Sequence, residues 1–210
     1  MKLVVFGATG GTGRQIVLQA LEHGHEVTAI VRNREAVSID HERLEVIQGD
    51  VLSQSSFSPW ISGKDAVLSA LGVNHRRPTT VYSEGTGNML KAMQSSGVRR
   101  LVCLSSAGLE IPSDTPLMQR IVIRLVIQKM YRHAYEDMSR MEKLVRRSGI
   151  DWTVIRPPRL TDGAKTGTYR VAYNQPLSKA RGISRGNLAD YMIQSISDSA
   201  SFQTIVDISM

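Results

Sequence analysis

The sequence predicts a doubly wound α/β fold, in which a mostly parallel sheet carries helices on both faces. Strand and helix signals alternate along the chain with short spacers, the pattern of repeated strand–helix–strand units. The first strand signal, residues 3–6, is an unbroken apolar run of the kind that parallel sheets bury on both faces. With 210 residues and no evident linker or internal repeat, the chain is expected to form a single domain over residues 1–210.

The remaining elements follow in a regular order. Helices are expected at residues 13–22, around 53–61, at 80–96, at 116–148 as one long helix that can be broken, and around 187–197. Strands are expected at residues 27–31, 44–47, 66–71, 100–105, 152–155 and 204–208, with a loop-rich segment before residue 182. Arg156-Pro157-Pro158 ends one strand because proline cannot donate to the ladder. Crossovers between parallel strands are right-handed, so this order places helices on both faces of the sheet.

The chain carries a formal charge of +7, from 26 basic and 19 acidic residues. Such a surface suits nucleic acid, and it equally suits anionic small molecules such as phosphorylated cofactors. The basic residues are spread along the chain, and the sequence has no basic helix with interleaved aromatic residues. We therefore expect a small-molecule partner and no nucleic acid.

Cellular location and partners are predicted from three features. Cys103 is the only cysteine, so no disulfide can form within the chain, and its apolar strand indicates a packing role. The N-terminal apolar run is too short for a signal peptide, and residues 121–127, interrupted by Arg124, are too few to span a membrane. We interpret residues 121–127 as core, with a partner surface as the alternative. We expect a cytoplasmic protein with no membrane partner and no metal, monomeric or weakly homo-oligomeric.

A glycine-rich segment directly follows the first strand and opens the first helix. Its spacing is Gly7-x-x-Gly10-x-x-Gly13. Glycine permits a tight turn and lets backbone N–H groups approach a pyrophosphate, which the positive end of the helix dipole also attracts. The motif alone is common, but its position between a strand and a helix is typical of a Rossmann dinucleotide site rather than of a turn without ligand. The residues expected to bind the cofactor here are Gly7, Thr9, Gly10, Gly11, Thr12 and Gly13.

The residues after the second strand discriminate between cofactors. An acidic residue there would bind the ribose 2′-hydroxyl of NAD, whereas this chain has Arg32-Asn33-Arg34. A guanidinium attracts the 2′-phosphate of NADP, which a carboxylate would repel. Arg32 and Arg34 therefore favour NADPH over NADH, with solvated surface arginines as the alternative.

The segment after the third strand, Gly49-Asp50-Val51, is expected at the adenine edge of the site. Asp50 can accept a hydrogen bond from the adenine amino group, and Val51 can pack on the ring. Asp50 can also cap the helix that follows. The two roles are compatible, so we expect that Asp50 can serve in both.

Several stretches on different elements resemble one family. The glycine loop GATGGTG, residues 7–13, resembles that of the atypical short-chain dehydrogenase/reductases. PTTVYSEG at residues 78–85, CLSSA at 103–107, TVIRPP at 153–158 and TGTY at 166–169 extend the similarity to biliverdin-IXβ reductase, also called flavin reductase, over nearly the whole chain. The resemblance implies NADPH as cofactor and hydride transfer to a flavin, a bilin or a quinone.

The same resemblance implies roles for individual residues. Ser106 would lie beside the nicotinamide and the substrate. The loop after the fourth strand, Gly72-Val73-Asn74, would pass the pyrophosphate and the nicotinamide ribose, and Leu71 before it is also a candidate cofactor-binding residue. Pro157 and Pro158 would flank the nicotinamide.

The chain departs from the biliverdin-reducing members at two positions. Arg159 stands where they carry a histidine after the double proline, and Met138 matches another of their histidines. A flavin is therefore a better expectation than biliverdin itself. Arg159, Arg76 and Arg77 are candidates to hold a phosphate or propionate of the substrate at the mouth of the cleft, with solvated surface arginines as the alternative.

Most short-chain dehydrogenases place Tyr-x-x-x-Lys on a helix for proton transfer, and the long helix has no such pair. Tyr135 comes four residues after Tyr131, and Ser139 comes four residues after Tyr135. This pattern disfavours carbonyl reduction and suits delocalised acceptors, for which positioning supplies much of the catalysis and solvent supplies the proton. Ser106 is then a positioning residue of an NADPH-dependent reductase. A non-enzymatic NADP-sensing or regulatory protein of the NmrA type is the alternative.

Overall fold

The computed structural model describes residues 1–210, leaving aside the side chain of residue 119. Eight strands form one sheet, in the order β3-β2-β1-β4-β5-β6-β10-β8. Their bounds are β3 Leu44–Gln48, β2 Glu26–Val31, β1 Lys2–Phe6, β4 Ala66–Ser69, β5 Arg100–Leu104, β6 Asp151–Arg156, β10 Thr204–Ser209 and β8 Arg170–Tyr173. All neighbours in this sheet pair in parallel except β8, which runs antiparallel to β10. The predicted doubly wound, mostly parallel sheet is confirmed.

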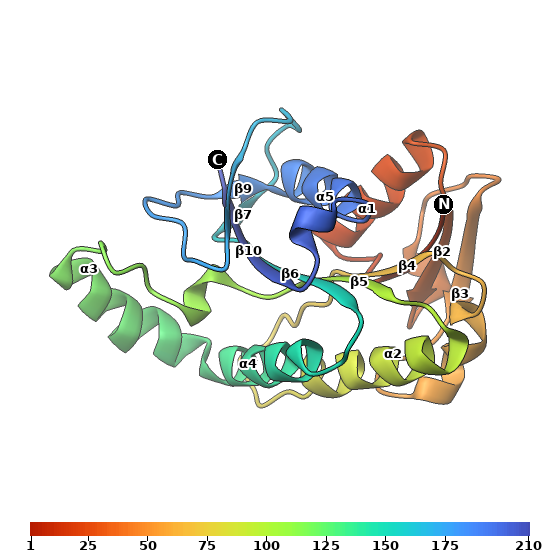
Figure 1. The fold of residues 1–210 in the computed structure, drawn as a ribbon, viewed down its shortest axis with the longest axis horizontal. Helices are drawn as coiled ribbons and strands as arrows, with labels where there is room; N and C mark the ends of the chain where they lie inside the picture. Colours follow the sequence, from red (N-terminus) through yellow and green to blue (C-terminus); the bar gives the residue numbers. More distant parts are fainter.

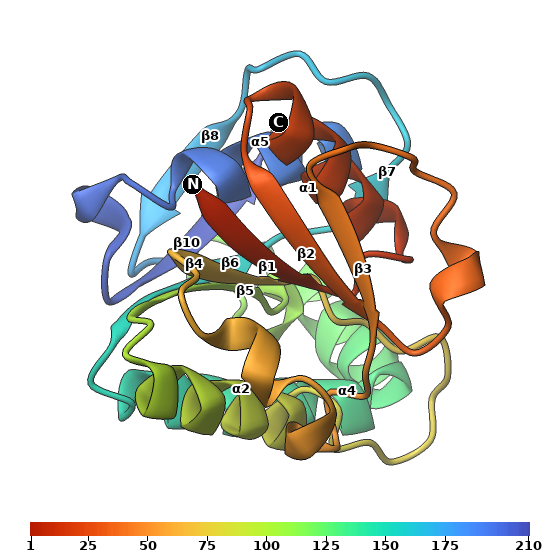
Figure 2. The same cartoon turned by 90° about the vertical axis from the view of Figure 1, so that its right-hand side faces the viewer.

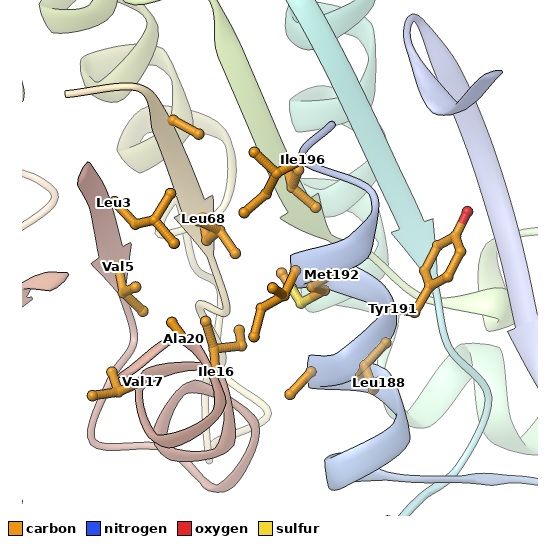
Figure 3. Close-up of a cluster of buried hydrophobic side chains, with 14 of the residues drawn as sticks. Leu3, Val5, Ile16, Val17, Ala20, Leu68, Leu188, Tyr191, Met192 and Ile196 are labelled. Atoms are coloured by element: carbon orange, nitrogen blue, oxygen red, sulfur yellow. The ribbon is translucent and has the colours of Figure 1, made fainter. Parts of the chain in front are cut away.

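Two pairs of helices cover the two faces of this sheet (Figure 1, Figure 2). Helices α1 (Gly11–Glu22) and α5 (Arg185–Gln194) lie on one face, and α2 (Ser83–Ser96) and α4 (Arg132–Arg146) lie on the other. Each pair encloses its own apolar core against the sheet. Figure 3 shows the first core, where Ile16 and Ala20 of α1 meet Met192 of α5. These side chains recur every three or four residues, which is why each helix buries one side.

The chain departs from the predicted elements in two stretches. The helix expected around residues 53–61 is two 3-10 turns, η2 (Gln54–Ser56) and η3 (Ser58–Ile61), because Pro59 lacks the N–H that a longer α-helix needs. The loop-rich segment before residue 182 contributes strand β8 and also β7 (Leu160–Thr161), which pairs with β9 (Ile183–Ser184) in a small second sheet.

The long helix predicted at residues 116–148 is broken into three parts. They are α3 (Leu117–Val122), the π-helical segment η5 (Ile123–Gln128) and α4. The interpretation of residues 121–127 as core is wrong, because α3 and η5 lie beyond the edge of the sheet and its core (Figure 1). Ile123 is half-buried, and the other five large apolar residues of this run are 37% to 67% exposed: Ile121, Val122, Leu125, Val126 and Ile127. No helix of the part of the chain described is long and apolar enough to cross a bilayer.

Strand β1 is the point at which the sheet reverses its direction of growth. The chain continues outward through β2 and β3 on one side of β1, and through β4, β5 and β6 on the other. The loops after β1 and β4 therefore diverge and leave a crevice at the carboxyl edge of the sheet. Ligands of open α/β sheets bind at such a switch point.

Candidate functional site: a dinucleotide cleft at the switch point

A cleft of about 680 Å³ opens at the carboxyl ends of the first four strands. Its wall is built from the loops that follow β1, β2, β3 and β4. Of the residues predicted to bind the cofactor, those that line it are Gly7, Thr9, Gly10, Gly11, Thr12, Arg32, Asp50, Val51, Leu71 and Gly72. Sequence reasoning and the fold thus place most of the predicted binding residues around one cavity, whose volume lies in the range of small-molecule and cofactor sites.

The glycine loop is shaped by close backbone contacts. Gly7 adopts φ +78°, and a Cβ there would collide with the carbonyl oxygen of Ala70 on the neighbouring strand loop. A Cβ on Gly13 would collide with the Gly7 carbonyl oxygen, so the start of α1 packs directly on the turn. The Gly10 N–H donates to the Gly7 carbonyl oxygen at 3.0 Å. Only glycine allows this tight approach of the helix to the strand end.

The N-terminus of α1 is available to an anion. Its N-cap is Gly10, and no side chain of the described residues accepts from the first N–H groups of the helix. By contrast, Ser184 caps α5 by accepting from the Asn187 N–H at 3.1 Å. The first turn of α1 holds no acidic residue that would repel a phosphate. Free N–H groups at the positive end of a helix dipole fit the pyrophosphate of a dinucleotide.

Sequence reasoning missed one cation of this cleft, Arg185. It is the first residue of α5, it lines the cleft, and its side chain lies against Gly11. A Cβ built on Gly11 would lie 2.7 Å from Nε of Arg185. The guanidinium forms an ion pair of 2.5 Å with the exposed carboxylate of Asp162. The sequence carries no signal for this contact, since Arg185 and Gly11 come from opposite ends of the chain.

The two arginines after β2 occupy different positions. Arg32 lines the cleft, and its carbonyl oxygen accepts from Nε2 of Gln48 at 3.3 Å. Arg34 begins the 3-10 turn η1 (Arg34–Ala36), is exposed, and is not among the residues that line the cleft. Asn33 turns the chain between them by accepting from the Glu35 N–H at 3.0 Å. The fold thus offers one guanidinium to the cleft from this pair.

The segment after β3 forms a turn whose polar groups are partly occupied. Oδ1 of Asp50 accepts from the Leu52 N–H at 2.9 Å, and the Asp50 N–H donates to Oγ of Ser56 at 3.0 Å. Asp50 therefore caps a turn rather than a helix. Val51 is buried beneath the cleft, and its carbonyl oxygen accepts from Nδ2 of Asn88 in α2 at 3.0 Å. Contact of Asp50 and Val51 with an adenine ring stays a prediction.

Ser106 follows strand β5, whose last residue, Leu104, lines the cleft. Oγ of Ser106 accepts from the Gly108 N–H at 3.2 Å and so caps the 3-10 turn η4 (Ala107–Leu109). The Tyr135 side chain of α4 lies against Gly108 of this turn, with its hydroxyl near Ser106. Burial raises the pKa of this tyrosine, and the neighbouring Ser106 only partly opposes that shift. Tyr135 thus stays protonated at neutral pH.

Sequence reasoning weighed Tyr135 only as the start of a Tyr-x-x-x-Lys pair and missed its contact with Ser106. The residue four positions later is Ser139, so no lysine follows to lower the pKa of the tyrosine. The sequence alone identifies both the serine after β5 and the tyrosine on the long helix. Their proximity depends on how α4 packs against the sheet.

The residues after β6 support the cleft from below. Pro157 is buried, and its carbonyl oxygen accepts from the Ala107 N–H at 3.0 Å, while Pro158 is half-buried. Neither proline is among the residues that line the cleft, although Leu160 just beyond them is. Arg159 is exposed, and its carbonyl oxygen accepts from the Ile183 N–H at 3.0 Å. The prolines therefore lie outside the lining of the cleft, and their place beside a nicotinamide stays a prediction.

The basic loop after β4 lies at the mouth of the cleft. Arg76 and Arg77 are exposed, and the residues before them, Asn74 and His75, line the cleft. A role for Arg76, Arg77 and Arg159 in holding a substrate stays a prediction.

The part of the chain described holds no group of three potential metal-ligating side chains.

A buried ion pair beneath Ser106 fixes the ends of β5 and β6. Arg156 donates from Nε to Oε1 of Glu142 at 2.9 Å and from Nη2 to Oε2 at 2.7 Å. Ser105 donates to Oε1 of the same glutamate at 2.7 Å. This network positions the strand end that carries Ser106.

Cys103 lies in the same strand. Burial raises the pKa of its thiol to about 12, which keeps the thiol protonated and confirms the packing role expected for it.

Two relatives in sequence cover different shares of the chain. The uncharacterized protein YwnB of Bacillus subtilis is 27% identical over 198 residues, 92% of this chain and 89% of YwnB. The photosystem II assembly factor Ycf39 of Synechocystis sp. is 31% identical over 122 residues, which are 56% of this chain and 37% of Ycf39.

A solved structure shares the fold throughout. ChuY, described as an anaerobillin reductase from Escherichia coli O157:H7, superposes with a TM-score of 0.82 at 19% identity. The match covers 100% of this chain and 97% of ChuY. At this identity the likeness establishes the shared fold.

The match to a protein family spans most of the chain, from the first residue of the glycine loop to a point beyond α5. Residues 7–199 match the family described as NAD(P)H-binding. Those residues include every residue that lines the cleft except Phe6, the uncapped helix N-terminus and both arginines of the lining. The chain therefore belongs to the NAD(P)H-binding family of Rossmann-type proteins.

Proposed function

We propose that this protein is an NADPH-dependent reductase that delivers hydride to a flavin or a similar conjugated acceptor, such as a bilin or a quinone. The observation that carries this proposal is that Ser106 and Tyr135 come close together just beyond β5, whose last residue, Leu104, lines the NAD(P)H cleft. The two side chains offer hydroxyl groups for positioning, and no lysine follows the tyrosine at the spacing that would activate it. A conjugated ring accepts hydride into a delocalised system and takes its proton from solvent, so it needs little from a side-chain acid.

NADPH is the preferred cofactor in this proposal because the segment after β2 offers a guanidinium, rather than a carboxylate, to a 2′-phosphate. Arg32 lines the cleft after β2, and Arg185 lies over the glycine loop. When bound, the nicotinamide supplies the hydride. The chain's own residues hold the phosphates at the N-terminus of α1 and position the acceptor near Ser106.

The name of ChuY, an anaerobillin reductase, supports a bilin as one member of the acceptor class. This chain carries exposed Arg159, Arg76 and Arg77 near the mouth of the cleft, where they can pair with the phosphate of FMN or the propionates of a bilin.

The test mixes purified protein with NADPH and, in turn, FMN, biliverdin and a soluble quinone, and follows the nicotinamide absorbance. The proposal predicts oxidation of NADPH with at least one acceptor. Gly13→Val serves as the inactive control, because its side chain would collide with the Gly7 carbonyl oxygen and so displace the glycine loop from the start of α1. Activity that survives in this variant would belong to a contaminant.

A second candidate is a non-catalytic NADP-binding regulatory protein. The resemblance to Ycf39, named as an assembly factor, favours it over the part of the chain that the two share. Tight binding of NADPH by titration, without turnover of any of the three acceptors, would support this candidate and overturn the reductase.

A further inference from the structure

Residues 117–131, here called the apolar helix, project beyond the sheet as α3, η5 and the turn that leads into α4 (Figure 1). The side chains of Leu117, Met118 and Leu125 are 71%, 74% and 67% exposed. Isolated apolar residues on a surface are ordinary, but a continuous apolar run on a projecting helix marks an interaction site.

Six of the exposed apolar residues form adjacent pairs that recur every fourth residue: Leu117-Met118, Ile121-Val122 and Leu125-Val126. Ile127, which is 37% exposed, lies outside these pairs. Residues four apart lie above one another on a helix, so the three pairs form one stripe. This stripe is a continuous apolar surface rather than scattered contacts.

The apolar helix is held by its other side. Nε2 of Gln128 donates to the Gly108 carbonyl oxygen at 3.0 Å, and η5 packs against η4. Nη2 of Arg120 donates to the Ser113 carbonyl oxygen at 2.8 Å. The Tyr131 and Tyr135 rings lie 6.0 Å apart at the junction with α4. These contacts fix the orientation in which the stripe faces away from the fold.

The charges around the stripe have one sign. Between Asp114 and Glu136 the chain has no acidic residue, and the cations in that interval are Arg120, Arg124, Lys129 and Arg132. The Glu136 carboxylate lies 3.3 Å from Arg132, and Arg120 is held by the Ser113 carbonyl oxygen, so Arg124 and Lys129 are the exposed cations without an acidic neighbour on the helix. An apolar stripe with basic residues beside it suits a surface that is both apolar and anionic.

We propose that the apolar helix docks on anionic membrane surfaces, lying in the plane of the bilayer with its stripe in the headgroup and acyl boundary. The cations would contact anionic headgroups, and the helix is too short to cross. A second copy of the chain fits less well, because pairing two such helices would bring like charges together. This proposal differs from the prediction, made from the sequence, that the protein has no membrane partner.

The experiment measures co-sedimentation of the full chain with vesicles of neutral phosphatidylcholine alone and with added phosphatidylglycerol. The proposal expects binding to the anionic vesicles that weakens as salt is raised. Leu125→Ser should lower the partition coefficient by about tenfold, since it removes apolar surface from the boundary. Leu144→Ser is the matched control, because Leu144 is a leucine of α4 that is also exposed, at 44%.

Three outcomes would overturn the proposal: no binding to either vesicle, equal binding to both, or equal losses from Leu125→Ser and Leu144→Ser. A dimer seen by sedimentation velocity that Leu125→Ser abolishes, without vesicle binding, would assign the stripe to self-association and also overturn it. NADPH titration of each variant verifies that the cleft is intact, because Leu125 and Leu144 lie outside it.

Discussion

Arg32 provides the sharpest test of cofactor choice. It lines the cleft at the end of β2 and is exposed, so its interaction with a 2′-phosphate is partly screened by water. Replacement by glutamate removes one attraction and adds one repulsion. A charge-assisted contact contributes about 1.5–3 kcal/mol, and we take the lower end because of the exposure. Arg32→Ala should then weaken NADPH binding by about tenfold, and Arg32→Glu by about a hundredfold.

The assay is titration of each variant with NADPH and with NADH. NADH lacks the 2′-phosphate, so its dissociation constant should change by less than about threefold in Arg32→Ala. Arg34→Glu is the matched control: the residue is also an exposed arginine, two positions away, and is not among the cleft residues. Raised salt should reduce the loss for NADPH, since exposed charges are screened.

Two results would refute this reasoning. Equal losses for NADPH and NADH would show that Arg32 acts on a part of the cofactor that both share. A loss in Arg34→Glu as large as that in Arg32→Glu would show that general surface charge, not the placement of one guanidinium, selects the cofactor.

Four further changes have defined expectations. Arg185→Ala should weaken NADPH and NADH alike, by about tenfold in titration, because both carry the pyrophosphate near Gly11; a loss confined to NADPH would contradict this. Tyr135→Phe should reduce steady-state turnover with FMN by less than about tenfold, and a loss of 10²-fold or more would make Tyr135 the proton donor. Glu142→Ala leaves the buried Arg156 without its main partner and should cost about 3–5 kcal/mol in urea unfolding, with unchanged stability refuting the buried pair. Burial raises the pKa of Asp207 to about 6, so stability should fall as the pH rises from about 4 to 6, by at most about 3 kcal/mol, and Asp207→Asn should remove that slope.

The sign of the Asp207 effect follows from proton linkage. The folded chain holds the proton more tightly than the unfolded chain, since burial disfavours the carboxylate. The contribution is therefore present in full below the ordinary pKa and is lost as the pH passes through about 6. A slope of the opposite sign that Asp207→Asn removes would contradict it.

Features carried by neighbouring residues were predictable. The glycine loop joins a strand to a helix within a few residues, so its spacing alone indicates the turn and the free helix end. Arg32 was predictable for the same reason, because a strand end sets the position of the next residue. The alternation of apolar runs likewise predicted a mostly parallel sheet, since a strand buried on both faces must be apolar throughout.

Contacts between distant segments were not predictable. Arg185 reaches Gly11 because α5 and α1 pack side by side, and Tyr135 comes near Ser106 because α4 packs against β6 and η4. Periodicity shows which side of a helix is apolar and does not show whether another element covers it. The apolar run at residues 121–127 was therefore assigned to the core, although the chain carries it past the edge of the sheet.

By itself, then, the sequence determined the fold class, the phosphate-binding turn and the cation at the end of the second strand, since each depends on residues close together in the chain. The tertiary structure decided which arginine covers the loop, which tyrosine meets the serine, and which apolar surface faces outward. These three depend on how helices pack on a twisted sheet, which brings together side chains that no local pattern connects.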